Sequence, residues 1–437
     1  MSGSSKLKNL HKVLYALPAG ILALPTIPVF ILLPSYYAES MGLGLAVVGS
    51  AFLGLRLLDV ISDPILGWIS DLIPSKYGKR KLPIAIGGLI GAPALIMIFT
   101  PSPDVGVEYL ILWGAILFLA WTAIQIPYVS WAVELEHRYG ARAQLNGLRE
   151  GAGLLGIMGT GALGLFLAAY SEAERFQILA WVTVVLGSGV IFLALKFVPN
   201  GRFALDKTSA WPTFPWKNKL FLRVLTAWFI NGLANGLPAV CLPLFMGHVL
   251  NASETDQATL VFVYFLFAVI GIQGWVCLAG HFSKHLVWCL SMALATVAFL
   301  GVPFLSNGDI IAFGVICAIT GFALGGDLAL PPAIQADCVD WDRYKFRQER
   351  TGSLFAYWSM STKLALGLAV GFSFSVLAWF GLDDQTEIVS QNSKTALIVI
   401  YSVIPIVLKI LAIRVMWTFP IGSNQHEAIE RRLERRV

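Results

Sequence analysis

The sequence predicts an all-α integral membrane protein with twelve transmembrane helices in two pseudo-symmetric halves of six. Composition is the first observation behind this fold class. Of the 437 residues, 57% are hydrophobic, only 13% are charged, and the mean hydropathy is +0.73. A soluble domain typically carries about 25% charged residues. The other two observations are a succession of long apolar segments and an internal repeat, so we expect the lipid bilayer to surround most of the chain.

Twelve apolar segments are long enough to cross a bilayer, which takes about 20 residues of helix. In chain order they are 13–38, 46–73, 83–101, 109–133, 145–170, 176–198, 220–248, 257–279, 285–305, 309–334, 351–380 and 394–418. Basic residues gather in alternate loops, whereas the opposite set of loops offers only Arg175 and Lys394. Because basic loops stay in the cytoplasm, this bias predicts that both termini are cytoplasmic. It also explains the net charge of +5 without a nucleic-acid partner.

Short motifs repeat between the two halves of the chain. Gly67-Trp68 recurs as Gly274-Trp275, and Val133-Glu134 recurs as Val339-Asp340 at nearly the same separation. Two matches at one separation indicate duplicated six-helix halves, an arrangement typical of secondary transporters. The predicted domains are an N-terminal half over 1–199, a cytoplasmic linker over 200–219 and a C-terminal half over 220–437.

The second expected span, 46–73, carries three charged side chains on one face. Arg56, Asp59 and Asp63 fall within about 60° of one another, because a helix turns about 100° per residue. Two close carboxylates in a low-dielectric cavity repel each other, and a bound cation or a shared proton relieves the repulsion. Asp59 and Asp63 are therefore candidate metal ligands for a small hard cation, and Arg56 can neutralise one of them. The alternative is a packing ion pair of Arg56 with Asp59, in which Asp63 caps the kink at Pro64.

Two groups of motifs resemble those of transporter families. Gly67, Asp71 and the basic run around Lys76 and Arg80 resemble the loop signature of the major facilitator superfamily. A second group resembles the glycoside–pentoside–hexuronide:cation symporter family over essentially the whole chain. It comprises Arg56-x-x-Asp59-x-x-x-Asp63-Pro64-x-x-Gly67, Ile126-Pro127-Tyr128, Ala336-Asp337-x-x-Asp340-x-x-x-Tyr344-Lys345, Ser359 and Lys363. The resemblance implies a major facilitator fold and a monomeric cation symporter in a bacterial inner membrane.

The resemblance also implies a coupling ion and its ligands. In the family, the paired aspartates of the second helix bind Na⁺, Li⁺ or H⁺, near a threonine of the fourth helix and a lysine of the eleventh. The matching residues are Asp59, Asp63, Thr122 and Lys363. Lys363 lies near the middle of its expected span, although a lysine there can also snorkel to the membrane interface. No other cofactor is expected.

The substrate site departs from that of the sugar-transporting family members. Their two sugar-binding aspartates are matched by Ala23 and Gln125, and their stacking aromatic residue by Val129. Two substrate classes stay open: a sugar, glycoside or sugar acid, and an amphipathic lipid such as a lysophospholipid. The candidate substrate-binding residues are Arg149, Gln125, Tyr128, Asn231 and Asn235. The two asparagines, one turn apart on the seventh span, can instead form hydrogen bonds between helices.

Charged residues near the cytoplasmic helix ends are expected to act in gating. The resemblance assigns this role to Arg56, Asp71, Lys76, Arg80, Asp337, Asp340 and Arg343. The last three are expected after the tenth span, where they either form charge pairs that close the inner gate or belong to a solvated loop.

The predicted function is symport of a cation and a small organic solute, with the ion binding first at Asp59 and Asp63. An enzyme is not expected, because the six histidines lie at or near span ends or loops, and no catalytic group converges in mid-membrane. A scaffold protein would not need charged residues such as Asp59, Asp63 and Lys363 inside the bilayer.

Overall fold

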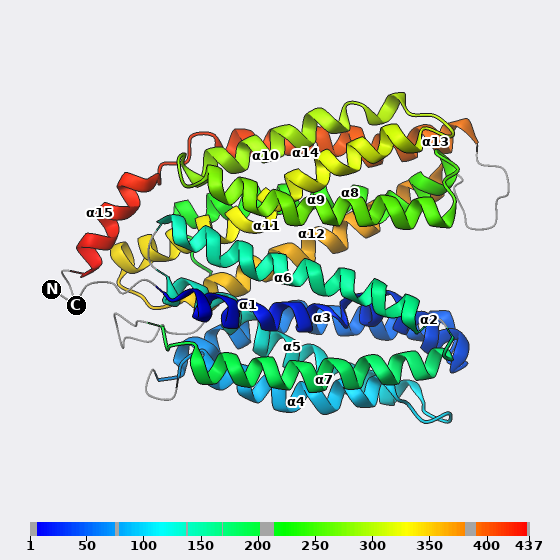
Figure 1. Cartoon of the computed structure of the whole chain (residues 1–437), viewed down its shortest axis with the longest axis horizontal. Helices are drawn as coiled ribbons and strands as arrows, with labels where there is room; N and C mark the ends of the chain where they lie inside the picture. Colours follow the sequence, from blue (N-terminus) through cyan, green and yellow to red (C-terminus); the bar gives the residue numbers. More distant parts are fainter. Residues whose placement is uncertain are drawn as a thin grey trace. The chain divides into compact units, whose positions relative to one another are not determined.

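All secondary-structure elements of the described chain are helices, which confirms the all-α prediction. A computed structural model describes residues 7–74, 78–136, 139–167, 169–201, 214–380 and 390–434 (Figure 1). The chain divides into two compact units. Unit 1 comprises Met1–Phe214 and Asp342–Met360, and unit 2 comprises Pro215–Trp341 and Ser361–Glu434.

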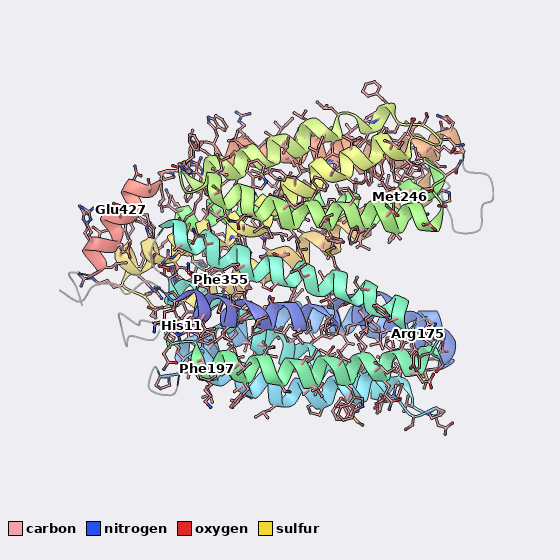
Figure 2. The ribbon with its side chains drawn as sticks, viewed as in Figure 1. His11, Arg175, Phe197, Met246, Phe355 and Glu427 are labelled. Atoms are coloured by element: carbon pink, nitrogen blue, oxygen red, sulfur yellow. The ribbon has the colours of Figure 1, made fainter. Side chains whose placement is uncertain are left out.

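Unit 1 is a bundle of long helices around an apolar core. Its helices are α1 (Asn9–Ala23), α2 (Leu33–Ser35), α3 (Leu45–Leu72), α4 (Lys81–Phe99), α5 (Val107–Leu135), α6 (Tyr139–Phe166) and α7 (Glu172–Phe197), with π-helical segments η1 (Pro28–Leu32) and η2 (Tyr36–Ser40) on either side of α2. α4 packs on α5 and α7, α1 packs on α6 and α7, and α3 packs on α5. Large apolar side chains such as Phe192 and Phe197 of α7 are exposed (Figure 2), as expected for helices that face lipid.

Unit 2 is a second helical bundle. Its helices are α8 (Lys219–His248), α9 (Glu254–Leu278), α10 (Lys284–Phe299), α11 (Ile310–Phe346), α12 (Thr351–Trp379), α13 (Gln391–Ile398), the π-helical segment η5 (Val399–Val403), α14 (Ile404–Met416) and α15 (Ser423–Glu434). The end of α11 and the start of α12, over Asp342–Met360, belong to unit 1. α14 packs on α8 and α10. The rings of Phe245 and Tyr401 stack in the core with centroids 4.4 Å apart.

Ten helices among the described residues are long and apolar enough to cross a membrane. The chain is thus an integral membrane protein. Two further expected spans, 46–73 and 145–170, coincide with the long helices α3 and α6. Both carry charged residues, among them Asp59 and Asp63 on α3 and Arg149 and Glu150 on α6. The full count of twelve transmembrane helices stays a prediction.

The tenth expected span, 309–334, ends too early. α11 continues to Phe346, so Asp337, Asp340 and Arg343 lie on a helix and not in a loop. All three side chains are buried, and a solvated loop at this place is therefore wrong. The reason is physical: hydropathy marks only the apolar part of a helix, whereas paired charges let the same helix continue beyond it.

Candidate functional site

The carboxylates of Asp59 and Asp63 meet at the hydroxyl group of Thr122. Thr122 Oγ1 lies 3.0 Å from Asp59 Oδ1 and 3.1 Å from Asp63 Oδ1. The exposed fractions of the three residues are 3%, 0% and 2% in the order Asp59, Asp63, Thr122. α3 places the two acids one turn apart, and α5, which packs on α3, supplies the threonine. Three hard oxygen atoms therefore converge at a desolvated place in unit 1.

This arrangement favours the uptake of a positive charge. Two ionised carboxylates this close together in a low-dielectric place raise each other's energy. A proton on one carboxyl or a small cation between them relieves that repulsion, and oxygen ligands suit a hard cation. Within the described ranges no group of three or more His, Cys, Asp or Glu side chains could hold a metal ion, so the candidate is a two-carboxylate site.

The other two charged residues predicted near this site have different surroundings. The Arg56 guanidinium lies over aromatic rings, with Cζ 3.8 Å from the ring centroid of Phe30 and 5.9 Å from that of Phe118. Asp59 still interacts electrostatically with Arg56. Lys363 lies on α12 in the part that belongs to unit 2. Within unit 1 the structure brings together three of the four predicted cation ligands.

Arg149 belongs to a second buried polar cluster of unit 1. Its guanidinium pairs with Glu150, the next residue of α6. The hydroxyl groups of Tyr15 and Tyr128 each donate to the other residue's backbone carbonyl, and the Arg149 side chain interacts with Tyr15. Arg149 Nη1 has no hydrogen-bond partner among the described residues, so one donor is available to a ligand. Gln125 lies half-buried on α5, three residues before Tyr128.

Arg80 and Asp71 form the centre of a charge cluster at one end of unit 1. Arg80 donates to Asp71 Oδ1 at 2.9 Å and to Glu134 Oε1 at 2.8 Å, and all three residues are buried. Asp71 also accepts hydrogen bonds from the backbone N–H groups of Gly352 and Ser353, both at 2.8 Å. These N–H groups belong to the first turn of α12, which lacks partners within its own helix. Asp71 therefore caps α12.

Two glycines allow this contact. A Cβ atom on Gly67 would lie 2.7 Å from the backbone oxygen of Gly352 and 2.6 Å from Ala356 Cβ. Any larger residue at position 67 would push α12 away from Asp71. The predicted gating residue Lys76 lies outside the described residues.

The loop between α11 and α12 carries further ion pairs of unit 1. Arg343 Nη2 lies 2.7 Å from Glu349 Oε1, and Arg350 Nε lies 2.8 Å from Asp342 Oδ2. Burial disfavours the charge of Glu349, but the charges of Arg343 and Lys79 outweigh it and hold the pKa of Glu349 below its ordinary value. Burial and the neighbouring charge of Arg80 lower the pKa of Lys79.

Asp337 and Asp340 take part in a corresponding cluster of unit 2. Lys284, at the start of α10, lies 2.8 Å from Asp337 Oδ2. His426 of α15 lies 3.2 Å from Asp340 Oδ2. In both units a basic residue at the start of one helix thus pairs with an acid near the end of the next long helix, Arg80 with Glu134 and Lys284 with Asp337. The two contact patterns are similar, but the residues differ from those of the sequence repeat, which aligns Glu134 with Asp340.

Asn231 and Asn235 lie in a buried ionic cluster that the sequence analysis missed. Lys409 Nζ donates to Asn231 Oδ1 at 3.0 Å and to Asn235 Oδ1 at 2.8 Å, and it lies 3.5 Å from Asp327 Oδ2. Trp288 donates its indole N–H to Asp327 at 2.7 Å. A signal was present: Asp327 and Lys409 both lie inside expected spans, where ionisable residues are rare and functional.

Comparisons with known proteins agree with this fold. A family model described as MFS/sugar transport protein matches residues 14–423. The glucuronide carrier protein homolog of Escherichia coli K12 is 24% identical over 422 residues, which cover 90% of this chain and 89% of that protein. The isoprimeverose transporter of Lactiplantibacillus pentosus is 22% identical over 362 residues, which cover 76% of this chain and 72% of that protein.

Two further similarities concern a lipid symporter and the fold. The sodium-dependent lysophosphatidylcholine symporter 1-A of Danio rerio is 22% identical over 218 residues, which cover 49% of this chain and 40% of that protein. The solved structure of a bacterial homologue of the iron transporter ferroportin, in an outward-facing state, aligns with a TM-score of 0.71. The alignment covers 94% of this chain and 97% of that chain at 14% identity, so it indicates the fold alone.

Proposed function

Because the chain belongs to the MFS/sugar transport protein family, we propose that it is a cation-coupled symporter of a glycoside or sugar acid. It has the major facilitator fold and is a transporter, not an enzyme. Similarity to the glucuronide carrier and the isoprimeverose transporter confirms the resemblance to the glycoside–pentoside–hexuronide:cation symporter family. The named substrates of these two relatives favour a sugar.

The observation that carries the proposal is the convergence of Asp59, Asp63 and Thr122. Two buried carboxylates that share one hydroxyl are unfavourable without a bound charge, so Na⁺, Li⁺ or H⁺ binds there first. Binding neutralises the site and raises the affinity of the protein for the solute, and this difference in affinity is the coupling. Lys363, on α12, stays a predicted cation ligand, and we propose that the protein works as a monomer with both termini in the cytoplasm.

The solute and gating roles rest on the other clusters. Arg149 offers its unpartnered Nη1 to a sugar hydroxyl or carboxylate. Tyr128 of α5 lies close to Arg149, and Gln125, three residues earlier on α5, is a further proposed contact. The buried pairs of Arg80 with Asp71 and of Lys284 with Asp337 act as gating contacts that break and re-form during transport.

A lysophospholipid is the second candidate solute. Apolar Ala23 and Val129 stand where sugar-transporting relatives carry polar or aromatic groups, and the lysophosphatidylcholine symporter of Danio rerio is similar to half of the chain. These observations concern fewer residues than those that favour a sugar.

Uptake into proteoliposomes tests the proposal. A labelled glucuronide, a neutral glycoside and lysophosphatidylcholine are each offered with an inward Na⁺ gradient, an inward proton gradient or neither. We expect a gradient to drive sugar uptake and Asp59→Asn or Asp63→Asn to abolish the effect. Asp104→Asn, which changes an exposed loop acid, should leave it intact. Lysolipid uptake alone contradicts the sugar assignment, and uptake equal under all gradients contradicts the coupling.

A further inference from the structure

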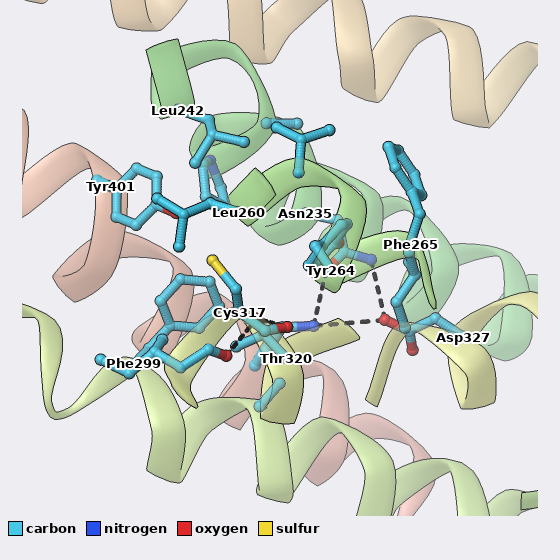
Figure 3. A pocket seen from close by; sticks show the side chains of 17 residues that line it. Asn235, Leu242, Leu260, Tyr264, Phe265, Phe299, Cys317, Thr320, Asp327 and Tyr401 are labelled. Carbon is cyan, nitrogen blue, oxygen red and sulfur yellow. Dashed lines mark hydrogen bonds and ion pairs between the residues drawn. The ribbon is translucent and has the colours of Figure 1, made fainter. Parts of the chain in front are cut away.

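Unit 2 contains a cavity of about 190 Å³, and all the residues that line it belong to this unit (Figure 3). Its lining comes from α8, α9, α10, α11, η5 and α14. One end is polar, with Asn235, Asp327 and Lys409. The remaining walls are apolar or aromatic and include Tyr264, Phe265, Phe299 and Tyr401. An apolar cavity with a few convergent polar groups is the usual form of a small-molecule site.

The polar end is not explained by stability. Burying a Lys–Asp pair removes two charges from water, and apolar residues of similar volume are often as stable or more so. Here the pair of Lys409 and Asp327 is held by the amides of Asn231 and Asn235 and by the Trp288 indole. Such an assembly beside an open space indicates that its polar atoms serve a ligand.

The charges at the polar end of the cavity favour an uncharged ligand with hydroxyl groups. Lys409 and Asp327 cancel, so the site carries no net charge. The three protons of the Lys409 ammonium already have three acceptors, Asn231, Asn235 and Asp327. A charged ligand would have to break this pair. A hydroxyl group, in contrast, both donates and accepts, so it can bind beside the pair without breaking it.

The walls of the cavity also favour a neutral ligand that contains a ring. Stacking on Phe245 at 4.4 Å fixes the ring of Tyr401, and Tyr264 interacts electrostatically with Asp327. Aromatic faces accept the apolar face of a ring, and phenol hydroxyls add donors and acceptors. The volume of about 190 Å³ is below the roughly 300–1,000 Å³ of pockets for drug-sized ligands. A single ring fits this space better than a lipid chain.

We propose that this cavity is a binding site in unit 2 for an uncharged sugar ring, whose hydroxyls contact Asp327 and Asn235 and whose apolar face packs on the aromatic wall. This inference rests on the proposed function, because it takes a glycoside as the solute. It assigns to Asn235 the substrate contact expected from the sequence, and it adds Asp327 and Tyr264, while Lys409 holds Asn235 and Asp327 in place.

Cys317 provides a built-in probe of the site. Of the five described cysteines, Cys317 alone lines the cavity. In a chain with Cys241, Cys277, Cys289 and Cys338 changed to alanine, methyl methanethiosulfonate modifies the Cys317 thiol, and mass spectrometry follows the rate. Methyl β-glucoside and methyl β-xyloside serve as the probes without ionic groups, and glycine betaine serves as the zwitterionic control.

We expect the glycosides to slow the modification. At ten times the Kd of the glycoside the rate should fall about tenfold, because only the empty fraction of the protein reacts. Tyr264→Phe and Asn235→Ala should weaken this protection, whereas Tyr109→Phe, the same chemical change in unit 1, should not. The protection assay needs no ion gradient, so its result is independent of the uptake assay. Sugar uptake without protection of Cys317 would contradict the binding site in unit 2 and leave the proposed function intact.

Three outcomes overturn the inference. The first is no protection of Cys317 by either glycoside at concentrations that saturate uptake. The second is protection of equal strength in Tyr264→Phe, in Asn235→Ala and in the parent chain, which would place the sugar elsewhere. The third is protection by glycine betaine alone, which would assign the cavity to a zwitterion.

Discussion

At the scale of single residues, Thr122 is the part of the proposed ion site that can be tested most directly. Its hydroxyl oxygen is shared by Asp59 and Asp63 at 3.0 and 3.1 Å. When a cation binds, the same oxygen can turn its lone pairs toward the ion, and a polar contact with a charged group contributes about 1.5–3 kcal/mol. Thr122→Val keeps the volume and removes the hydroxyl, so we expect the ion concentration for half-maximal uptake to rise roughly 10- to 100-fold.

Thr122→Ser is the matched control, because it keeps the oxygen and loses only a methyl group. The ion concentration for half-maximal uptake by this variant should stay within about threefold of the parent value. The reason is that burial of one methyl group contributes under about 1 kcal/mol. Equal values for the valine and serine variants would show that the hydroxyl is not an ion ligand.

At the scale of elements, the start of α12 depends on a residue far away in the sequence. Asp71 accepts the N–H groups of Gly352 and Ser353, and it also pairs with Arg80. Loss of an N-cap acceptor costs about 0.5–2 kcal/mol, and Arg80 would lose one of its two carboxylates. We therefore expect Asp71→Ala to lower the thermal midpoint of the purified protein by several degrees.

Glu427→Gln is a suitable control for this measurement. Glu427 also pairs with an arginine, Arg431, but both side chains are mostly exposed, and exposed pairs contribute about 0–1 kcal/mol. Its thermal midpoint should stay close to that of the parent protein. If Asp71→Ala leaves the midpoint unchanged as well, the cap does not stabilise α12.

At the scale of the whole molecule, local patterns predicted more than long-range contacts. Helical periodicity placed Asp59 and Asp63 on one face, and the structure shows this. The apolar segments located the helices, but hydropathy could not show that α11 continues to Phe346. The contact of Asp71 with Gly352 spans 281 residues, and that of Lys409 with Asp327 joins two separate spans. No sequence pattern within one helix predicts which of these residues contact each other. Their charged members can nevertheless be picked out in the sequence, because charged residues are rare inside a membrane.

The proposed coupling is a property of the whole molecule, because the proposed ion ligands Asp59 and Asp63 belong to unit 1, whereas the proposed solute contacts Asn235 and Asp327 belong to unit 2. Thermodynamic linkage requires that the ion and the solute change each other's Kd by the same factor, typically about 5- to 150-fold. Calorimetry on the purified protein should therefore give a lower Kd for methyl β-glucoside in Na⁺ or at acidic pH than in K⁺ at neutral pH. The Kd of the ion should fall by the same factor when the glucoside is present.

Asp63→Asn should bring this factor close to one and leave the weaker, ion-free affinity for the glucoside, whereas Asp104→Asn should keep the full factor. The reason is that only the first change removes a ligand of the ion, and an ion that does not bind cannot shift any equilibrium. A glucoside Kd that is the same in all salts and at both pH values for the unchanged protein would mean that solute binding is uncoupled, and that Asp59 and Asp63 serve packing instead.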